Sequence, residues 1–261
     1  GELKTLEGQV SIPSSKIEAL VDGITGRPYD EALTLVGLQF LADRRSAYDQ
    51  AGALARTFVL QSLVTVKVLT AYGETIEFRA GTPERRDYDA MKNALIGVGF
   101  GDGLLLQIFA RLRSKGLVIG DVIAIFRARP FFPAESLELI ANGLMKWFAD
   151  DQVGAVHVLV PQIESVLRAM LRAVGVPVTR VEGHHVEMLL LTQLLNRLAR
   201  LGFPDDIMFT MQVVLTDAGM NVRNRVAHGW LKRHECTPAL TVRIVHLLLA
   251  LATVQGDEAK T

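Results

Sequence analysis

Apolar residues recur at every third or fourth position through most of this chain, in stretches long enough to form helices. The clearest stretch, residues 150–174, would place one set of apolar side chains on a single helix face: Val156, Leu159, Val160, Ile163, Leu167, Met170 and Leu171. A strand would instead alternate inward and outward residues with a period of two. The spacing therefore predicts a long amphipathic helix, which Pro161 could kink or interrupt because proline lacks a backbone N–H.

The same spacing predicts helices along the rest of the chain, separated by glycine and proline residues. The expected helices cover residues 28–48, 51–69, 83–96, 104–115, 134–148, 186–201, 204–217 and 237–254. Between them we expect a helix break in the glycine string 97–103 and a turn or small hairpin over 175–183. The alternating segment 75–79 could pair as a short strand. The fold class predicted from the whole pattern is all-α.

A polar hinge, residues 149–152, separates two parts of the chain. We expect residues 1–150 to form a helical N-terminal region of unknown role, and residues 151–261 to form a separate C-terminal domain. Four helices and one short helix in the second part fit an up-and-down helical bundle.

The composition limits the partners and the cellular environment. The 28 basic residues equal the 28 acidic residues, so a polyanion must be bound by a local patch rather than by net charge. A single cysteine, Cys236, excludes an internal disulfide and suits a reducing cytoplasm. Asp102 and glycines interrupt the apolar run 93–110, and the run 244–254 is too short to span a bilayer. We therefore expect buried helices and no membrane partner.

The segment from Gly219 to Gly229 carries the residues best suited to chemistry. Asn221 is a good N-cap and Gly229 a good stop, so the residues between them are predicted to form a short helix. On that helix Asn224 and His228 lie four positions apart and share a face, and the long side chain of Arg223 can reach its edge.

These residue types suit phosphate chemistry. Histidine exchanges protons near neutral pH, and arginine matches phosphate oxygens and can stabilise a negative transition state. Asparagine can orient either the imidazole or a ribose hydroxyl. No acidic residue occurs between Asp217 and Glu235, which predicts a local basic patch suited to metal-independent cleavage of RNA.

The pattern Gly-x-Asn-x-Arg-Asn-x-x-x-His-Gly resembles the RNxxxHG signature of an uncharacterised domain family, and it also fits the broader HEPN pattern. Residues 157–168 resemble that family's first helix, and the resemblance covers residues 151–261. HEPN domains are helical bundles that typically pair and bring two Arg/His motifs together; many are metal-independent ribonucleases, and others bind nucleotides or partners.

The resemblance implies a homodimer that acts on RNA or a nucleotide and needs no metal or other cofactor. It also implies residue roles: Arg223 would bind the scissile phosphate, His228 would transfer protons, and Asn224 would position either of them. Asn221 and Gly229 would support the motif helix.

Several alternatives remain open at this stage. Glu164 and Arg168 lie four apart on the long helix, so they either form an intrahelical ion pair or brace the motif helix by binding its polar groups. The motif residues could also only cap helix ends, or bind RNA without cutting it. A metal site at His184 and His185 lacks a third ligand at useful spacing, and the glycine string lacks the spacing of a phosphate-binding loop. His246 is expected to be a hydrogen-bonded core or interface residue.

Overall fold

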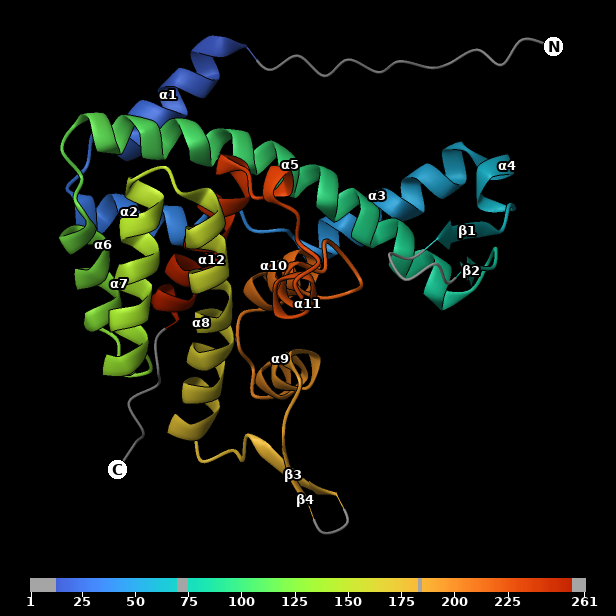
Figure 1. The fold of residues 1–261 in the computed structure, drawn as a ribbon. Helices are drawn as coiled ribbons and strands as arrows, with labels where there is room; N and C mark the ends of the chain where they lie inside the picture. Colours follow the sequence, from blue (N-terminus) through green and yellow to red (C-terminus); the bar gives the residue numbers. More distant parts are fainter. Residues whose placement is uncertain (1–12, 70–74, 183–184, 255–261) are drawn as a thin grey trace.

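The computed structural model describes residues 13–69, 75–182 and 185–254, and the regular structure in them is predominantly helical (Figure 1). The predicted all-α class is confirmed. The helices of the first part are α1 (Ser14–Thr25), α2 (Tyr29–Leu38), α3 (Arg44–Thr57), α4 (Val59–Ser62), α5 (Pro83–Ser114), α6 (Ile119–Arg127) and α7 (Ala134–Phe148). Those of the second part are α8 (Gln152–Ala173), α9 (Leu191–Arg200), α10 (Asp205–Leu215), α11 (Val222–Ala227) and α12 (Pro238–Thr253).

Helix α12 lies at the centre of the fold. Every residue from Leu240 to Ala252 is buried, and a helix that is apolar on all sides must be surrounded by others. It packs against α2, α5, α8 and α10. Thr237 begins the helix, because its hydroxyl accepts a hydrogen bond from the backbone N–H of Leu240 at 3.2 Å. The core therefore contains residues from both sides of the hinge, and the division at residue 150 stays a prediction.

Helix α8 runs unbroken through Pro161, so of the two possibilities, a kink or an interruption, the interruption does not occur. Pro161 lies on the exposed side of the helix, where water can solvate the carbonyl that proline leaves without a donor. The opposite face packs on α7, beside it in Figure 1, and on α12. Gly143 of α7 permits this packing, because a Cβ there would lie 2.5 Å from Cδ2 of Leu159. A long rigid α8 follows, and it supports α9 and α11.

Helix α5 corrects the prediction of a break at residues 97–103. It is one helix of 32 residues that crosses the whole fold (Figure 1). Gly97, Gly99 and Gly103 face open space, and Gly101 faces Nη2 of Arg243, where a Cβ would lie 2.9 Å away. Each glycine weakens a helix by about 1 kcal/mol relative to alanine, and the buried residues on both sides offset this loss. By length and composition α5 could cross a membrane, but core helices of soluble proteins meet the same criterion.

A buried polar network joins α12 to α5 and to the loop after α2. The fully buried guanidinium of Arg243 donates to Asp102 Oδ1 at 2.6 Å, to Phe40 O at 2.8 Å and to Val98 O at 3.0 Å. It also contacts Nδ1 of His246 at 3.0 Å. His246 is thus a core histidine, as predicted. The charge of Arg243 is paired and hydrogen-bonded, the condition under which a buried charge is tolerated.

The sequence analysis did not predict α1 and α6, and further differences from the predicted elements lie at chain reversals. The helix expected over 28–48 divides into α2 and α3 because Phe40 adopts a left-handed backbone (φ 60°) and Asp43 caps α3 through the N–H of Ser46. The helix expected over 51–69 ends early, and its last residues form β1 (Val66–Leu69), which pairs antiparallel with β2 (Thr75–Phe78). The strand considered at 75–79 is therefore confirmed.

A second hairpin follows α8. Strands β3 (Thr179–Glu182) and β4 (His185–Met188) pair antiparallel and project from the bundle (Figure 1). The small hairpin expected at 175–183 is present, but its second strand extends beyond that range. The helix expected from residue 186 therefore begins only at Leu191.

Candidate functional site

The loop before α11 fixes where the motif helix begins. A Cβ at Gly219 would lie 1.9 Å from the carbonyl oxygen of Val213, so this position requires glycine. Met220 donates its N–H to the same carbonyl at 2.8 Å. Asn221 then turns the chain with a left-handed backbone (φ 55°), which asparagine tolerates better than most residues. Gly219 and Asn221 are therefore explained by the path of the backbone.

Asn221 occupies the N-cap position, but its side chain does not cap the helix as predicted. Its Oδ1 accepts a hydrogen bond from Nδ2 of Asn224 at 2.9 Å instead. The amide of Asn224 is thereby fixed in orientation.

The far end of α11 stops at Gly229, as predicted. Gly229 has φ 69°, and the next two residues fold back so that the N–H groups of Trp230 and Leu231 bond to the carbonyl of Arg225 at 2.8 and 3.1 Å. The exposed imidazole of His228 stacks on the indole of Trp230, with ring centroids 4.6 Å apart and an interplanar angle of 25°. His228 therefore lies on the surface beside a flat aromatic side chain.

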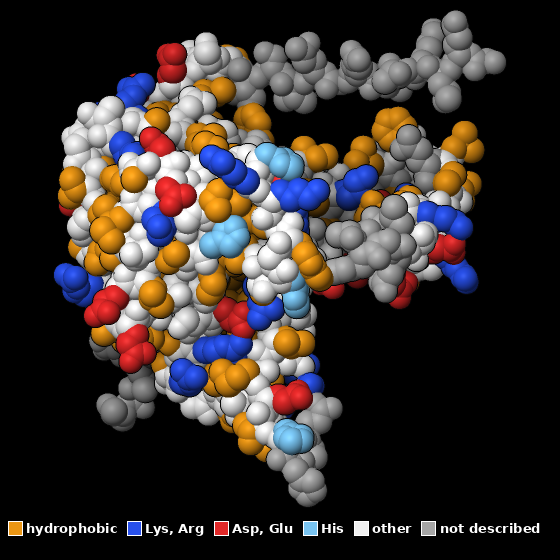
Figure 2. Space-filling model, viewed as in Figure 1, with side chains coloured by type: hydrophobic (Ala, Val, Ile, Leu, Met, Phe, Trp, Pro, Cys, Tyr) orange, Lys and Arg blue, Asp and Glu red, His pale blue; other side chains and the backbone are white. Residues whose placement is uncertain are grey.

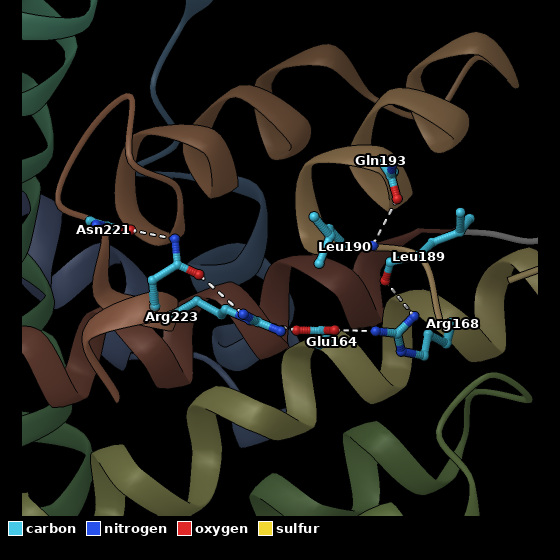
Figure 3. A network of polar contacts seen from close by, with 8 residues as sticks. Glu164, Arg168, Leu189, Leu190, Gln193, Asn221 and Arg223 are labelled. Carbon is cyan, nitrogen blue, oxygen red and sulfur yellow. Dashed lines mark hydrogen bonds and ion pairs between the residues drawn. The ribbon is translucent and has the colours of Figure 1, made fainter. Parts of the chain in front are cut away.

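A chain of polar contacts connects the motif to α8 (Figure 3). Arg223 donates from Nε to Glu164 Oε2 at 2.8 Å and from Nη1 to Asn224 Oδ1 at 3.0 Å. The other oxygen of Glu164 binds Arg168, which also donates to the carbonyl of Leu189 at 2.9 Å. The side chains of Glu164 and Arg223 are only 12% and 26% exposed, so this pairing is stronger than an ordinary surface ion pair.

This network decides between the two interpretations of the residues on α8. Glu164 does both things expected of it: it pairs with Arg168 within the helix and it holds Arg223 of the motif. Among the described residues, Arg168 is connected to the motif through Glu164. The prediction that α8 braces the motif helix is therefore confirmed for Glu164, and Arg168 has an indirect part in it.

The three predicted catalytic residues do not form one hydrogen-bonded group. Arg223 and Asn224 are in contact, but Arg223 turns toward α8 rather than toward His228. Asn224 bonds to Asn221 and Arg223 through its amide, and the ring of His228 makes no hydrogen bond within residues 13–69, 75–182 and 185–254. Within one chain, Asn224 and His228 therefore do not act on a ligand from a shared helix face as the sequence predicts.

The basic patch is smaller than the sequence predicts. Glu235 binds Arg225 at 2.5 Å, and this guanidinium holds the pKa of the Glu235 carboxyl below its usual range. Lys232, Arg233 and His234 remain exposed. Figure 2 shows Lys, Arg and His side chains gathered on the face above α10 and α11, with few acidic side chains among them.

A pocket of about 380 Å³ lies between α8 and α11, next to the motif. We call it the α8–α11 pocket, and its lining residues are Val160, Pro161, Glu164, Ser165, Arg168, Arg172, Arg223, Val226 and Ala227. Sequence reasoning missed Arg172 and Trp230. Arg172 follows Glu164 and Arg168 at a spacing of four, which places all three on one helix face, and this spacing was the available signal.

The other candidate groups offer less chemistry. Within the part of the chain that the structure describes, no group of three His, Cys, Asp or Glu side chains could hold a metal ion. His185 is exposed on β4, and His184 lies outside the described residues. Cys236 is buried, and burial raises the pKa of its thiol, which disfavours the reactive thiolate.

Comparisons of the chain with protein-family models, with curated proteins and with solved structures find no match. The resemblance to the RNxxxHG family and to HEPN domains thus stays a prediction from the motif.

Proposed function

We propose that this protein is a HEPN-like, metal-independent endoribonuclease that acts as a homodimer through Arg223 and His228. One observation carries the proposal: the helix with the motif forms one wall of a pocket lined by three guanidinium groups, and His228 is exposed at the end of the same helix. Guanidinium groups bind phosphodiesters well, and an exposed imidazole can exchange protons near neutral pH.

The reaction would use the ribose itself as the nucleophile. The 2′-oxygen attacks phosphorus while a base removes its proton, the bond from phosphorus to the 5′-oxygen breaks, and an acid protonates that oxygen. The products are a 2′,3′-cyclic phosphate and a 5′-hydroxyl. Arg223 would stabilise the charge on the phosphate oxygens, and Asn224 would hold Arg223 in place through the bond to its Oδ1.

A homodimer would supply the two proton-transfer groups. One chain offers a single exposed His228 in the motif, whereas the reaction needs both a base and an acid. Two copies that place their α11 helices together would provide two imidazoles for one phosphate. The stacked Trp230 would offer an aromatic surface for a nearby base, since RNA-binding proteins commonly stack unpaired bases on aromatic side chains.

The test is RNA cleavage in the presence of a chelator, with the product ends identified. Arg223→Ala and His228→Ala should each lower the rate by about 10²–10⁴-fold, a typical range for one acid–base or charge-stabilising group. His185→Ala and Arg200→Ala are matched controls, because both residues are exposed and lie outside the motif. Activity per chain should also fall when dilution dissociates the dimer. Equal rates in all variants, or no cleavage by the wild type at high concentration, would contradict the proposal.

A second candidate is RNA or nucleotide binding without cleavage. The specific observation in its favour is that Arg223 is already engaged by Glu164 and Asn224, while the ring of His228 has no polar group among the described residues to fix its tautomer. Catalytic histidines usually have such a partner. This candidate predicts salt-sensitive binding that weakens in Arg223→Ala, with no product formed.

A further inference from the structure

The α8–α11 pocket contains an excess of positive charge. Three arginines line it against one carboxylate, so its net charge is +2. Both oxygens of that carboxylate, Glu164, already accept from Arg168 and Arg223. The remaining arginine, Arg172, is exposed and forms no ion pair or hydrogen bond with any residue in the described ranges. The pocket thus presents a guanidinium without a counter-charge.

Arg223 also keeps part of its donor capacity for a ligand. Its Nε and Nη1 are used by Glu164 and Asn224, and Nη2 makes no hydrogen bond to a described residue. Arg172 lies on α8 and Arg223 on α11, so each of the two helices that form the pocket carries a guanidinium into its lining. Two guanidinium groups that approach from different sides are a common arrangement for binding phosphate.

The other walls suit the sugar or base of a nucleotide rather than a bare anion. Val160 and Pro161 of α8 and Val226 and Ala227 of α11 line the pocket with apolar surface. Ser165 contributes a hydroxyl that is shared with Ser136 at 2.9 Å. The volume of about 380 Å³ lies within the range of small-molecule sites, which combine apolar walls with a few polar groups.

The surroundings favour a nucleic acid over an acidic peptide. The pocket adjoins the motif helix, and beyond that helix the chain continues through exposed Trp230, Lys232 and Arg233. An exposed aromatic side chain close to exposed basic ones suits a strand that carries both bases and phosphates. An acidic peptide would use the basic groups but not the aromatic one.

We infer that the α8–α11 pocket is a subsite for the nucleotide that carries the scissile phosphate, and that this phosphate is bound between Arg172 and Arg223. The inference rests on the proposed function, because it assumes that an RNA strand binds at the motif next to the pocket. Pro161 and Val226 contact the ribose or base, and Arg172 is a binding residue that takes no part in proton transfer.

The experiment measures binding separately from cleavage. The probe is a short, fluorescently labelled 2′-O-methyl oligonucleotide, which lacks the nucleophile and cannot be cut. Its dissociation constant is measured against salt concentration for the wild type, Arg172→Ala and the control Arg200→Ala, which removes an equally exposed arginine from α9. Arg172→Ala should weaken binding about five- to tenfold at about 0.1 M salt and reduce the salt slope by about one ion, and Arg200→Ala should do neither.

The outcomes separate this inference from the proposed function. If the wild type cuts RNA but Arg172→Ala binds the probe as well as the wild type does, only the subsite is refuted. If binding depends on Arg172 but no RNA is cut, the subsite stands and the catalytic proposal fails. Equal weakening by Arg172→Ala and Arg200→Ala, no binding at all, or displacement of the probe by oligoglutamate of equal charge would each overturn the subsite.

Discussion

The buried histidine of α12 makes a specific prediction about stability and pH. Nε2 of His246 bonds to the carbonyl of Gln39 at 2.7 Å, and Nδ1 faces the guanidinium of Arg243 at 3.0 Å. A ring that donates from Nε2 and accepts at Nδ1 must be neutral. Burial, and secondarily the charge of Arg243, lower the pKa of His246 from 6.5 to about 3. The folded protein therefore keeps this ring unprotonated under conditions in which the unfolded chain binds a proton.

The sign and size of the effect follow from this difference. Because the folded pKa of His246 is depressed, the unfolded state binds the extra proton, and folding stability falls as the pH drops from about 6.5 toward about 3. Between about pH 7 and pH 5 the loss from this one group is about 2 kcal/mol. Asp102 acts in the opposite direction, because burial raises the pKa of its carboxyl and favours proton uptake by the folded state.

The assay compares the wild type with His246→Gln by urea unfolding across this pH range. The variant is less stable overall, but its free energy of unfolding should fall by about 2 kcal/mol less between about pH 7 and pH 5, because other titrating groups are common to both proteins. NMR of the folded wild type provides an independent reading of the ring. Parallel pH profiles for the two proteins, or an imidazole that titrates above about pH 5, would refute the argument.

Three further predictions concern the backbone of the site and the buried charge. Gly219→Ala should destabilise the fold by about 1–3 kcal/mol or more, because its Cβ would meet the carbonyl of Val213. Gly99→Ala should instead stabilise the fold by about 0.5–1 kcal/mol, because its Cβ would face open space on a helix. Equal urea midpoints for the two variants would contradict this prediction. Asn221→Gly should lose about 1 kcal/mol through one hydrogen bond, and Asn221→Ala should lose a further 1 kcal/mol or so through left-handed strain, an order that thermal unfolding can check. Asp102→Asn should cost about 3–5 kcal/mol, because it leaves a buried guanidinium without a counter-charge; a loss below about 1 kcal/mol would disprove this.

Two helices of the second part, α8 and α12, were predictable because their local signals agree. The helix expected over 150–174 is α8, Gln152–Ala173, and the helix expected over 237–254 is α12, Pro238–Thr253. In both cases the apolar spacing begins where a capping residue stands, so the two signals indicate the same start of the helix. The capping residue is Asp151 for α8 and Thr237 for α12. No contact with a distant segment is needed to place these ends.

Two errors in the first part have one physical cause. The predicted break at residues 97–103 and the predicted continuation through Phe40 both fail where the chain meets Arg243. Arg243 lies 203 residues from Phe40 and 145 from Val98, so no local pattern could reveal that Phe40 offers it a carbonyl or that Gly101 leaves room for it. Tertiary contacts of this kind override local propensity.

The site was predictable to a different extent at each position. The motif helix, the stop at Gly229 and the link from Glu164 to the motif follow from spacing and residue type. The side chain of Asn221 was assigned wrongly because its left-handed backbone depends on the turn after α10. The stacking of Trp230 on His228 depends on the chain reversal after the helix, which composition does not specify.

The positions of the motif differ in how much of their identity the fold explains. Gly219, Asn221 and Gly229 are needed for the path of the backbone, and Arg223 joins α11 to α8 through Glu164. A loss of activity in Arg223→Ala would therefore have two causes, the missing phosphate contact and a less stable fold. Breaking this partly buried ion pair should lower the free energy of unfolding by more than about 1 kcal/mol.

His228 is the exception, because its ring is exposed, stacks on Trp230 and makes no hydrogen bond with a described residue. Its loss should cost less than about 1 kcal/mol. His228→Ala should consequently unfold at nearly the same urea concentration as the wild type, so a fall in RNA cleavage in this variant does not come from loss of the fold. A large loss of stability in His228→Ala would mean that the histidine supports the fold, and the case for catalysis would lose the one motif residue that the fold does not require.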